Sequence, residues 1–156
     1  MNLPATFRSV TQAVPAELKS IPPETARQSR KGGWSAAQEL GHLLDSAIMN
    51  HARIIRVLTE ETPALPDYDG NFCVAAHAYA TRDWLELVTV WEALNRHFLM
   101  AIDRISADDW RRSCVFGGET VTLEFVVSDY LRHALHHLAH IGIDVHSFQM
   151  QLVPRS

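Results

Sequence analysis

The chain has 156 residues, of which 47% are hydrophobic and 21% are charged, a composition ordinary for one globular domain spanning residues 1–156. Its net charge of −4 excludes the basic surface expected of a nucleic-acid or anionic-membrane binder. We find neither a secretory signal nor an apolar run near the roughly 18 residues of a membrane span. Only Cys73 and Cys114 are present, without the spacing of a disulfide framework or a thiolate metal site, so we expect a cytoplasmic protein.

Helices account for the first half of the chain. A first helix is predicted over roughly residues 5–20, with an interruption near Pro15, because two prolines follow the segment. A turn at residues 31–34 leads into Ser35-Ala-Ala-Gln38, the signature of a capping box that opens a second helix. This helix is predicted to run to about Glu61 and to stop before the next proline.

The second half of the chain contributes two more helices. Residues 62–72 form a long connection rich in turn residues, and the segment 72–79 leads into a third helix over about residues 81–105. A break at Phe116-Gly-Gly118 precedes the last helix, which is predicted over about residues 122–148. Four main helices without sustained alternation at period two predict an all-α four-helix bundle.

The last helix carries an unusual concentration of histidine. Four histidines lie within eight residues of it: His133, His136, His137 and His140. Positions four apart share a helix face, so His133 and His137 can converge on one metal ion. Neutral imidazole is a common ligand for zinc, nickel, copper and iron. The competing interpretation is a polar helix face that happens to be rich in histidine. Two ligands rarely hold an ion alone, so the metal-site interpretation requires a third ligand.

The second helix offers that third ligand. Its predicted core stripe includes seven apolar residues: Leu40, Leu44, Ala47, Ile48, Ile54, Ile55 and Leu58. On roughly the opposite face lie His42, Asp45 and Arg53, where a peripheral helix would normally show a run of Lys and Glu. If His42 faces the histidines of the last helix, a site with three nitrogens results. Such a site keeps coordination positions open, as catalytic zinc sites do.

The remaining histidines receive different interpretations. His51 falls within the apolar stripe and is predicted to be a hydrogen-bonded core residue. Three others lack a partner at ligand spacing and are predicted on the surface or in loops: His77, His97 and His146. His136 is predicted at the rim of the site. The spacing leaves His140 open either as a ligand in place of His133 or as a partner that orients a ligand, a role also open to two aspartates, Asp45 and Asp129.

Three segments together resemble the DinB-like superfamily of bacterial metal-binding bundles: residues 34–46, 66–72 and 133–141. The first, WSAAQELGHLLDS, is similar to the family stretch W-S-x-x-E/Q-x-x-x-H-L-x-D-S, and the last, HALHHLAHI, to H-x-x-H-H-x-x-Q/H-I. The resemblance covers nearly the whole chain and implies a four-helix bundle of DinB-like type with a long crossover connection. It further implies His42, His133 and His137 as metal ligands. His140 departs from the glutamine that is frequent at its position.

The resemblance also implies a class of activity. DinB-like proteins include bacillithiol-dependent thiol S-transferases, and the mycothiol-dependent maleylpyruvate isomerases contain a similar domain, while other relatives are described only as hydrolases. An open three-histidine ion lowers the pKa of a bound thiol or water. We therefore expect a metal-dependent enzyme that activates a thiol or water against a small-molecule substrate. Its cofactors would be zinc or nickel, with iron or manganese as alternatives, and a low-molecular-weight thiol as co-substrate.

Further expectations concern the surroundings of the site and the assembly. The entrance would be lined by residues of the turns that flank the second helix and by the rim histidine: Trp34, Tyr68, Asp69 and His136. The family resemblance and the few solvated residues of the second helix lead us to expect a homodimer. The rival hypothesis, from another class, is a non-catalytic metal-binding or stress-response bundle that acts through self-association.

Overall fold

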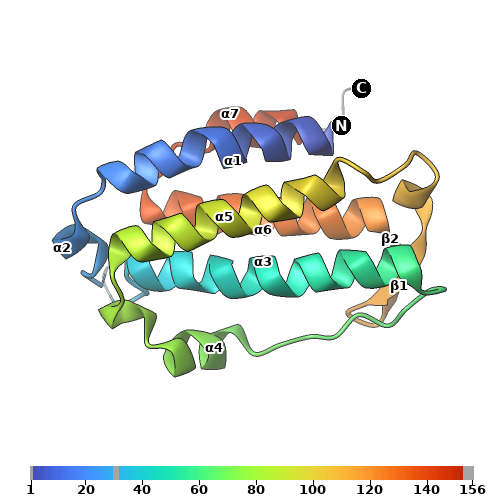
Figure 1. Ribbon diagram of the computed structural model, residues 1–156. Helices are drawn as coiled ribbons and strands as arrows, with labels where there is room; N and C mark the ends of the chain where they lie inside the picture. The colour runs from blue at the N-terminus through green and yellow to red at the C-terminus, as the bar shows by residue number, and fades with distance from the viewer. Residues whose placement is uncertain (1, 30–31, 153–156) are drawn as a thin grey trace.

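Four long helices pack lengthwise in the computed structural model, which describes residues 2–29 and 32–152 (Figure 1). They are α1 (Leu3–Ser20), α3 (Ala36–Thr59), α5 (Trp84–Ile102) and α6 (Leu123–Ile141). Helix α3 packs mainly against α6 and α5, and α1 packs mainly against α5. This arrangement confirms the predicted all-α four-helix bundle. Within the described ranges, no helix combines the length and apolarity needed to cross a membrane.

The topology follows from a long crossover. Helices α3 and α5 run in the same direction in Figure 1, so the chain must return along the bundle between them. The return contains α4 (Gly70–His77) and the 3₁₀ turn η1 (Tyr79–Thr81). Asp69 caps α4 by accepting a hydrogen bond from the amide of Phe72 at 2.9 Å. The crossover was predicted, but α4 was not, because its eight residues are too few for a periodic pattern.

A β-hairpin is the other element that the sequence analysis missed. Strands β1 (Ser113–Phe116) and β2 (Glu119–Thr122) pair antiparallel. Gly117 and Gly118, with φ of 58° and 85°, supply the left-handed conformations that a two-residue hairpin turn requires. Backbone hydrogen bonds join Val115 to Pro63 and to Leu65. The hairpin therefore fixes the beginning of the crossover, where the sequence indicated only a break.

Two predictions about the helices were wrong: the end of the last helix and the interruption of the first. Helix α6 ends at Ile141 instead of near residue 148, because Gly142 adopts φ 108° and the amides of Gly142 and Ile143 bond to the carbonyl of Leu138. The residues beyond form a separate short helix, α7 (His146–Gln151). Helix α1 continues without interruption through Pro15, which is buried. The remaining short elements are α2 (Pro23–Ala26) and η2 (Asp109–Arg111).

Helix α3 buries a face that its apolar pattern did not predict. Ile48 and Ile55, assigned to the core stripe, are 54% and 39% exposed. His42, Asp45 and Arg53, assigned to the opposite side, are buried. The reason is that α3 packs against α6 and α5 and is also covered by α4 and η1 of the crossover. Polar residues on α3 are thereby enclosed, which is the condition for a buried site.

Gly41 makes the contact between α3 and the crossover possible. A Cβ atom at this position would lie 2.1 Å from Cγ of Tyr79, so the aromatic ring of η1 rests directly on the helix backbone. The hydroxyl of Tyr79 donates to Oδ1 of Asp45 at 2.9 Å. Burial raises the pKa of Asp45, although the hydrogen bond from Tyr79 and the nearby His77 oppose the rise.

We predict that Gly41→Ala destabilises the protein. Helix propensity alone would stabilise it by about 1 kcal/mol, but overpacking against Tyr79 costs roughly 1–3 kcal/mol or more. Urea denaturation measures the difference in the free energy of unfolding. In a Tyr79→Ala background the same glycine substitution should become neutral or stabilising, and a stabilising effect in the wild-type background would show that the ring does not occupy this position.

Candidate metal centre

Three imidazoles meet where the beginning of α3 lies beside the end of the antiparallel α6. His42 comes from α3, and His133 and His137 come from successive turns of α6. The Nε2 atom of His133 lies 3.0 Å from Nε2 of His42 and 3.1 Å from Nε2 of His137. All three ligating atoms lie within 4.8 Å of one another. The structure thus brings together the three histidines that the sequence singled out.

These distances suit a shared ion. Two nitrogens bound at about 2.1 Å with a tetrahedral angle stand about 3.4 Å apart. The two observed separations, 3.0 and 3.1 Å, differ from that value by a few tenths of an ångström, which small side-chain rotations can supply. Three nitrogen donors also match the ligand set of an open catalytic site, in which further positions are left to water or substrate.

Burial keeps the imidazoles of His42 and His133 neutral. The pKa of His42 is lowered to about 4, chiefly by burial and then by the neighbouring His137, against an opposing effect of Glu39. The pKa of His133 is lowered to about 3 by burial and by His137 and His42. Both side chains are therefore unprotonated near pH 7, and a neutral ring nitrogen is what a metal ligand must present.

Glu39 orients one of the three rings. Its Oε2 atom lies 2.5 Å from Nδ1 of His137, so this nitrogen carries the hydrogen and donates a hydrogen bond to the carboxylate. The Nε2 atom of His137 is then left with its lone pair toward the other histidines. The sequence analysis missed Glu39. A usable signal was its position three residues before His42, which places both side chains on one face of α3.

Ser46 supports the second ring. Its hydroxyl oxygen lies 3.3 Å from Nδ1 of His133, and Asn50 donates to the carbonyl and hydroxyl oxygens of Ser46. Because Nε2 of His133 faces the other two imidazoles, its Nδ1–H donates a hydrogen bond to the hydroxyl oxygen of Ser46. His42 differs, because its buried Nδ1 has no hydrogen-bond partner among the described residues; packing alone holds this ring. A Cβ atom at Gly70 would approach Cε1 of His42 to 2.8 Å.

Aromatic side chains lie beside the centre, and two of them are the predicted pocket residues Trp34 and Tyr68. The ring centroid of Trp34 lies 5.2 Å from that of His42 and 6.3 Å from that of His137. On another side, Tyr68 stacks at 6.5 Å from His42. The guanidinium of Arg53 lies 5.8 Å from the centroid of Tyr68 and donates to the carbonyl of Pro66, which holds this part of the crossover in place.

The other residues suggested for the site have different surroundings. Asp45 bonds to Tyr79 and lies 3.4 Å from Nδ1 of His77, so its contacts hold the crossover rather than a ligand. Asp129 is half-buried and acts electrostatically on Arg53. Asp69 is exposed and caps α4. Among the described residues, these contacts do not join the three aspartates to the imidazole cluster, and the catalytic or orienting roles predicted for Asp45 and Asp129 stay predictions.

The outer histidines of α6 lie beside the cluster. Nδ1 of His140 lies 3.4 Å from Oε1 of Glu39, which connects His140 to the ligand His137 through one carboxylate. The ring of His136 lies 4.2 Å from that of His140 and 5.3 Å from that of His137. His136 is exposed, and its predicted role at the rim of the site stays a prediction. The prediction that His51 is a core residue was wrong: it is half-buried, with its ring 4.8 Å from that of exposed His97.

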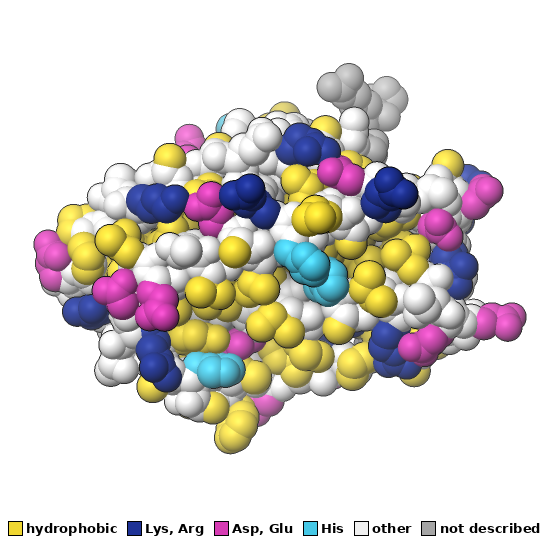
Figure 2. Space-filling model, viewed as in Figure 1, with side chains coloured by type: hydrophobic (Ala, Val, Ile, Leu, Met, Phe, Trp, Pro, Cys, Tyr) yellow, Lys and Arg dark blue, Asp and Glu magenta, His cyan; other side chains and the backbone are white. Residues whose placement is uncertain are grey.

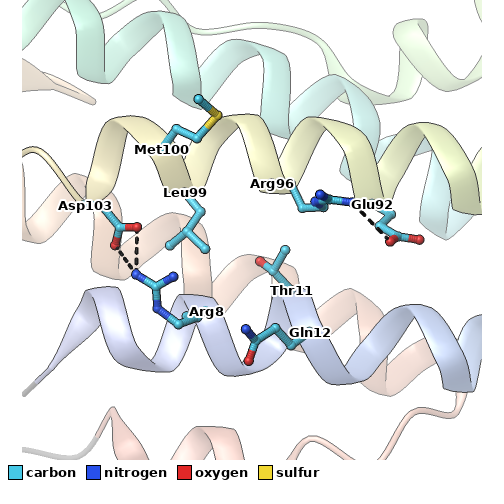
Figure 3. A pocket seen from close by; sticks show the side chains of 8 residues that line it. All are labelled: Arg8, Thr11, Gln12, Glu92, Arg96, Leu99, Met100 and Asp103. Atoms are coloured by element: carbon cyan, nitrogen blue, oxygen red, sulfur yellow. Dashed lines mark hydrogen bonds and ion pairs between the residues drawn. The ribbon is translucent and has the colours of Figure 1, made fainter.

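A groove of about 470 Å³ lies elsewhere, between α1 and α5 (Figure 3). Its charged side chains are paired with one another. Arg8 contacts both carboxylate oxygens of Asp103 at 2.7 Å, and Arg96 lies 3.8 Å from Glu92. With its charges matched in this way, the groove presents no group that calls for a ligand, and the imidazole cluster is the better candidate for function.

Comparisons with known proteins identify the family of the chain. A family model described as the DinB superfamily matches residues 6–141. YfiT of Bacillus subtilis, provisionally named a metal-dependent hydrolase, is 30% identical over 139 residues, covering 85% of this chain and 78% of YfiT. A Bacillus pumilus protein with the same provisional description is 32% identical over 144 residues, covering 90% of this chain and 77% of its own length.

Solved structures extend the comparison. The structure of YfiT from Bacillus subtilis, described as having an unusual four-helix bundle topology, superposes with a TM-score of 0.78 at 26% identity over 96% of this chain and 87% of that one. A mycothiol-dependent maleylpyruvate isomerase superposes with a TM-score of 0.76 at 18% identity, covering 96% of this chain and 65% of the isomerase. The second likeness concerns the fold alone.

We predict that the metal-free protein loses stability as the pH falls from about 6.5 toward 4. The unfolded chain protonates its histidines near 6.5, whereas His42 and His133 have pKa values of about 4 and about 3 in the folded state. In that window the unfolded state binds more protons, so the free energy of unfolding decreases with falling pH. Urea titrations in the presence of a chelator measure it at each pH.

A matched variant isolates this contribution. His133→Gln removes one of the two depressed groups and should flatten the pH dependence between about 6.5 and 4. The exposed His146 provides the control, because His146→Gln should leave the slope unchanged. Equal slopes for wild type and His133→Gln would mean that burial of the imidazole cluster does not cause the effect.

Proposed function

The chain belongs to the DinB superfamily, and on this premise we propose that it is an enzyme that uses a divalent metal ion to activate a nucleophile. His42, His133 and His137 would hold the ion through Nε2. The observation that carries the proposal is the convergence of three imidazole nitrogens: Nε2 of His133 lies 3.0 Å from Nε2 of His42 and 3.1 Å from Nε2 of His137. A bound divalent ion supplies a lowered pKa for a coordinated thiol or water, which yields a nucleophile at neutral pH.

Each side chain around the three ligands would have its own role in the proposed reaction. Glu39 fixes the tautomer of His137, and Ser46 fixes the orientation of His133. Trp34 and Tyr68 present apolar walls beside His42, and such walls exclude bulk water and favour a small organic substrate. His140, which lies 3.4 Å from Oε1 of Glu39, would accept a proton released near the centre.

Two nucleophiles fit the proposed centre. Water would make the protein a hydrolase, in line with the provisional names of its relatives. A low-molecular-weight thiol would make it an S-transferase, since an open coordination position with imidazole ligands accepts sulfur as readily as oxygen when the ion is zinc or nickel. The ligand set does not distinguish them, so the experiment has to include both.

The test is turnover by the purified protein after chelation and reloading with zinc, nickel, iron or manganese separately. One arm combines a chlorinated nitroaromatic electrophile with cysteine or another small thiol, and the other follows hydrolysis of p-nitrophenyl acetate without thiol. We expect one arm to depend on added metal, with a loss of about 100-fold or more in kcat/KM for His42→Ala, because removing a ligand displaces the reacting centre.

The controls for this experiment are histidines outside the cluster. His51→Ala and His146→Ala should retain metal content and turnover. Activity that survives His42→Ala or chelation would contradict the proposed mechanism. Stoichiometric metal binding without turnover in either arm would favour the rival function, a non-catalytic metal-binding bundle.

We also predict that metal removal leaves the fold intact. The bundle core is formed by buried apolar residues of all four long helices, so folding does not require the binding energy of an ion, in contrast to a structural zinc site. The chelated protein should keep its helical circular dichroism and melt cooperatively at a lower temperature than the loaded protein. Complete unfolding on chelation would assign the metal a structural role.

The expected homodimer remains a proposal, supported by the surface of α3. Ile48 and Ile55 are exposed there, and Figure 2 shows hydrophobic side chains gathered over α3 and α5 on this side of the molecule. A second copy would cover such a surface. Sedimentation analysis should give a dimer that Ile48→Glu weakens by about tenfold or more, while Phe125→Glu, at an exposed position of α6, leaves it intact. A monomeric wild-type protein would contradict the proposal.

A further inference from the structure

We propose a second cation site beside the three-histidine centre, formed by Glu39 of α3 and by His136 and His140 of α6. The proposal rests on the proposed function in one respect, that His137 uses Nε2 for the first ion. The second site would take a divalent transition-metal ion such as Zn²⁺, Ni²⁺ or Co²⁺, for which imidazole and carboxylate are suitable ligands.

The spacing of the two histidines is the first observation. His136 and His140 are four residues apart on α6, and their ring centroids lie 4.2 Å from each other. Two imidazoles one helical turn apart present nitrogens to a common point. Both side chains are exposed, so a cation reaches them directly from solvent and water molecules complete its coordination.

The second observation is a carboxylate that reaches the pair from another helix. Oε1 of Glu39 lies 3.4 Å from Nδ1 of His140, which is the separation of two ligand atoms around one ion. Ligand atoms of Glu39, His137 and His140 all lie within 4.8 Å of one another, and the ring of His136 borders this group, with its centroid 4.2 Å from that of His140.

The two oxygens of Glu39 allow the sites to coexist. Oε2 accepts the hydrogen bond from Nδ1 of His137 at 2.5 Å, and Oε1 faces His140. His137 thus belongs to the first site through Nε2, while the negative charge of Glu39 lies between the two ions and offsets their repulsion. Because the first site is buried and has three nitrogens, the exposed second site should bind more weakly.

The experiment is a metal titration of untagged, chelated and dialysed full-length protein with Zn²⁺ alone, followed by calorimetry and by elemental analysis at saturation. We expect two equivalents, the second bound at least tenfold more weakly than the first. The double variant His136→Gln/His140→Gln should bind one equivalent with the tight affinity unchanged within about threefold. His97→Gln/His146→Gln, which removes two exposed histidines elsewhere, should still bind two.

A spectroscopic titration with Co²⁺ separates the sites further. The visible absorption bands of wild type should rise in two steps, the first complete at one equivalent of Co²⁺ and the second at two equivalents. The double variant His136→Gln/His140→Gln should lack only the second step. His42→Ala should lose the first set. A single equivalent in wild type, or two equivalents unaffected by His136→Gln/His140→Gln, would overturn the second site alone. Failure to bind any ion would overturn the proposed function as well.

Discussion

The antiparallel packing of α3 against α6 is the constraint on which the candidate centre depends. It places His42, in the second turn of α3, opposite His133 and His137 near the end of α6. Burial there keeps His42 and His133 neutral, with pKa values near 4 and 3. A polar cluster inside a bundle costs stability unless its groups find partners. Glu39 and Ser46 provide two of them, and a metal ion would satisfy the three converging nitrogens together.

The crossover between α3 and α5 completes this environment. Without α4 and η1, the polar face of α3 would be solvated, and the pKa of His42 would lie closer to 6.5. Close backbone approaches make the coverage possible, because Gly41 accommodates the ring of Tyr79 and Gly70 lies against His42. Because α3 and α5 are parallel, the chain has to return along the bundle between them, and this returning segment forms one wall of the candidate site.

The sequence predicted the four helices and the three converging histidines, because periodicity and ligand spacing are local signals. The exposed Ile48 and Ile55 show the limit of such signals, since the buried face of α3 is decided by what the crossover covers. The short elements were not predicted for the same reason, because the hairpin at Gly117 is held by backbone hydrogen bonds from Val115 to Pro63 and Leu65 of the crossover. Glu39 is identified as a partner of His137 only once two helices are packed together.

Anomalous X-ray diffraction from crystals of the metal-loaded protein would test the central claim most directly. Data collected at the absorption edge of the bound metal locate the ion without reference to the ligands. The account predicts a fully occupied ion with Nε2 of His42, His133 and His137 at about 2.0–2.2 Å, and Nδ1 of His137 still bonded to Glu39. A principal anomalous peak elsewhere, or an ion whose coordination omits His42, would contradict it.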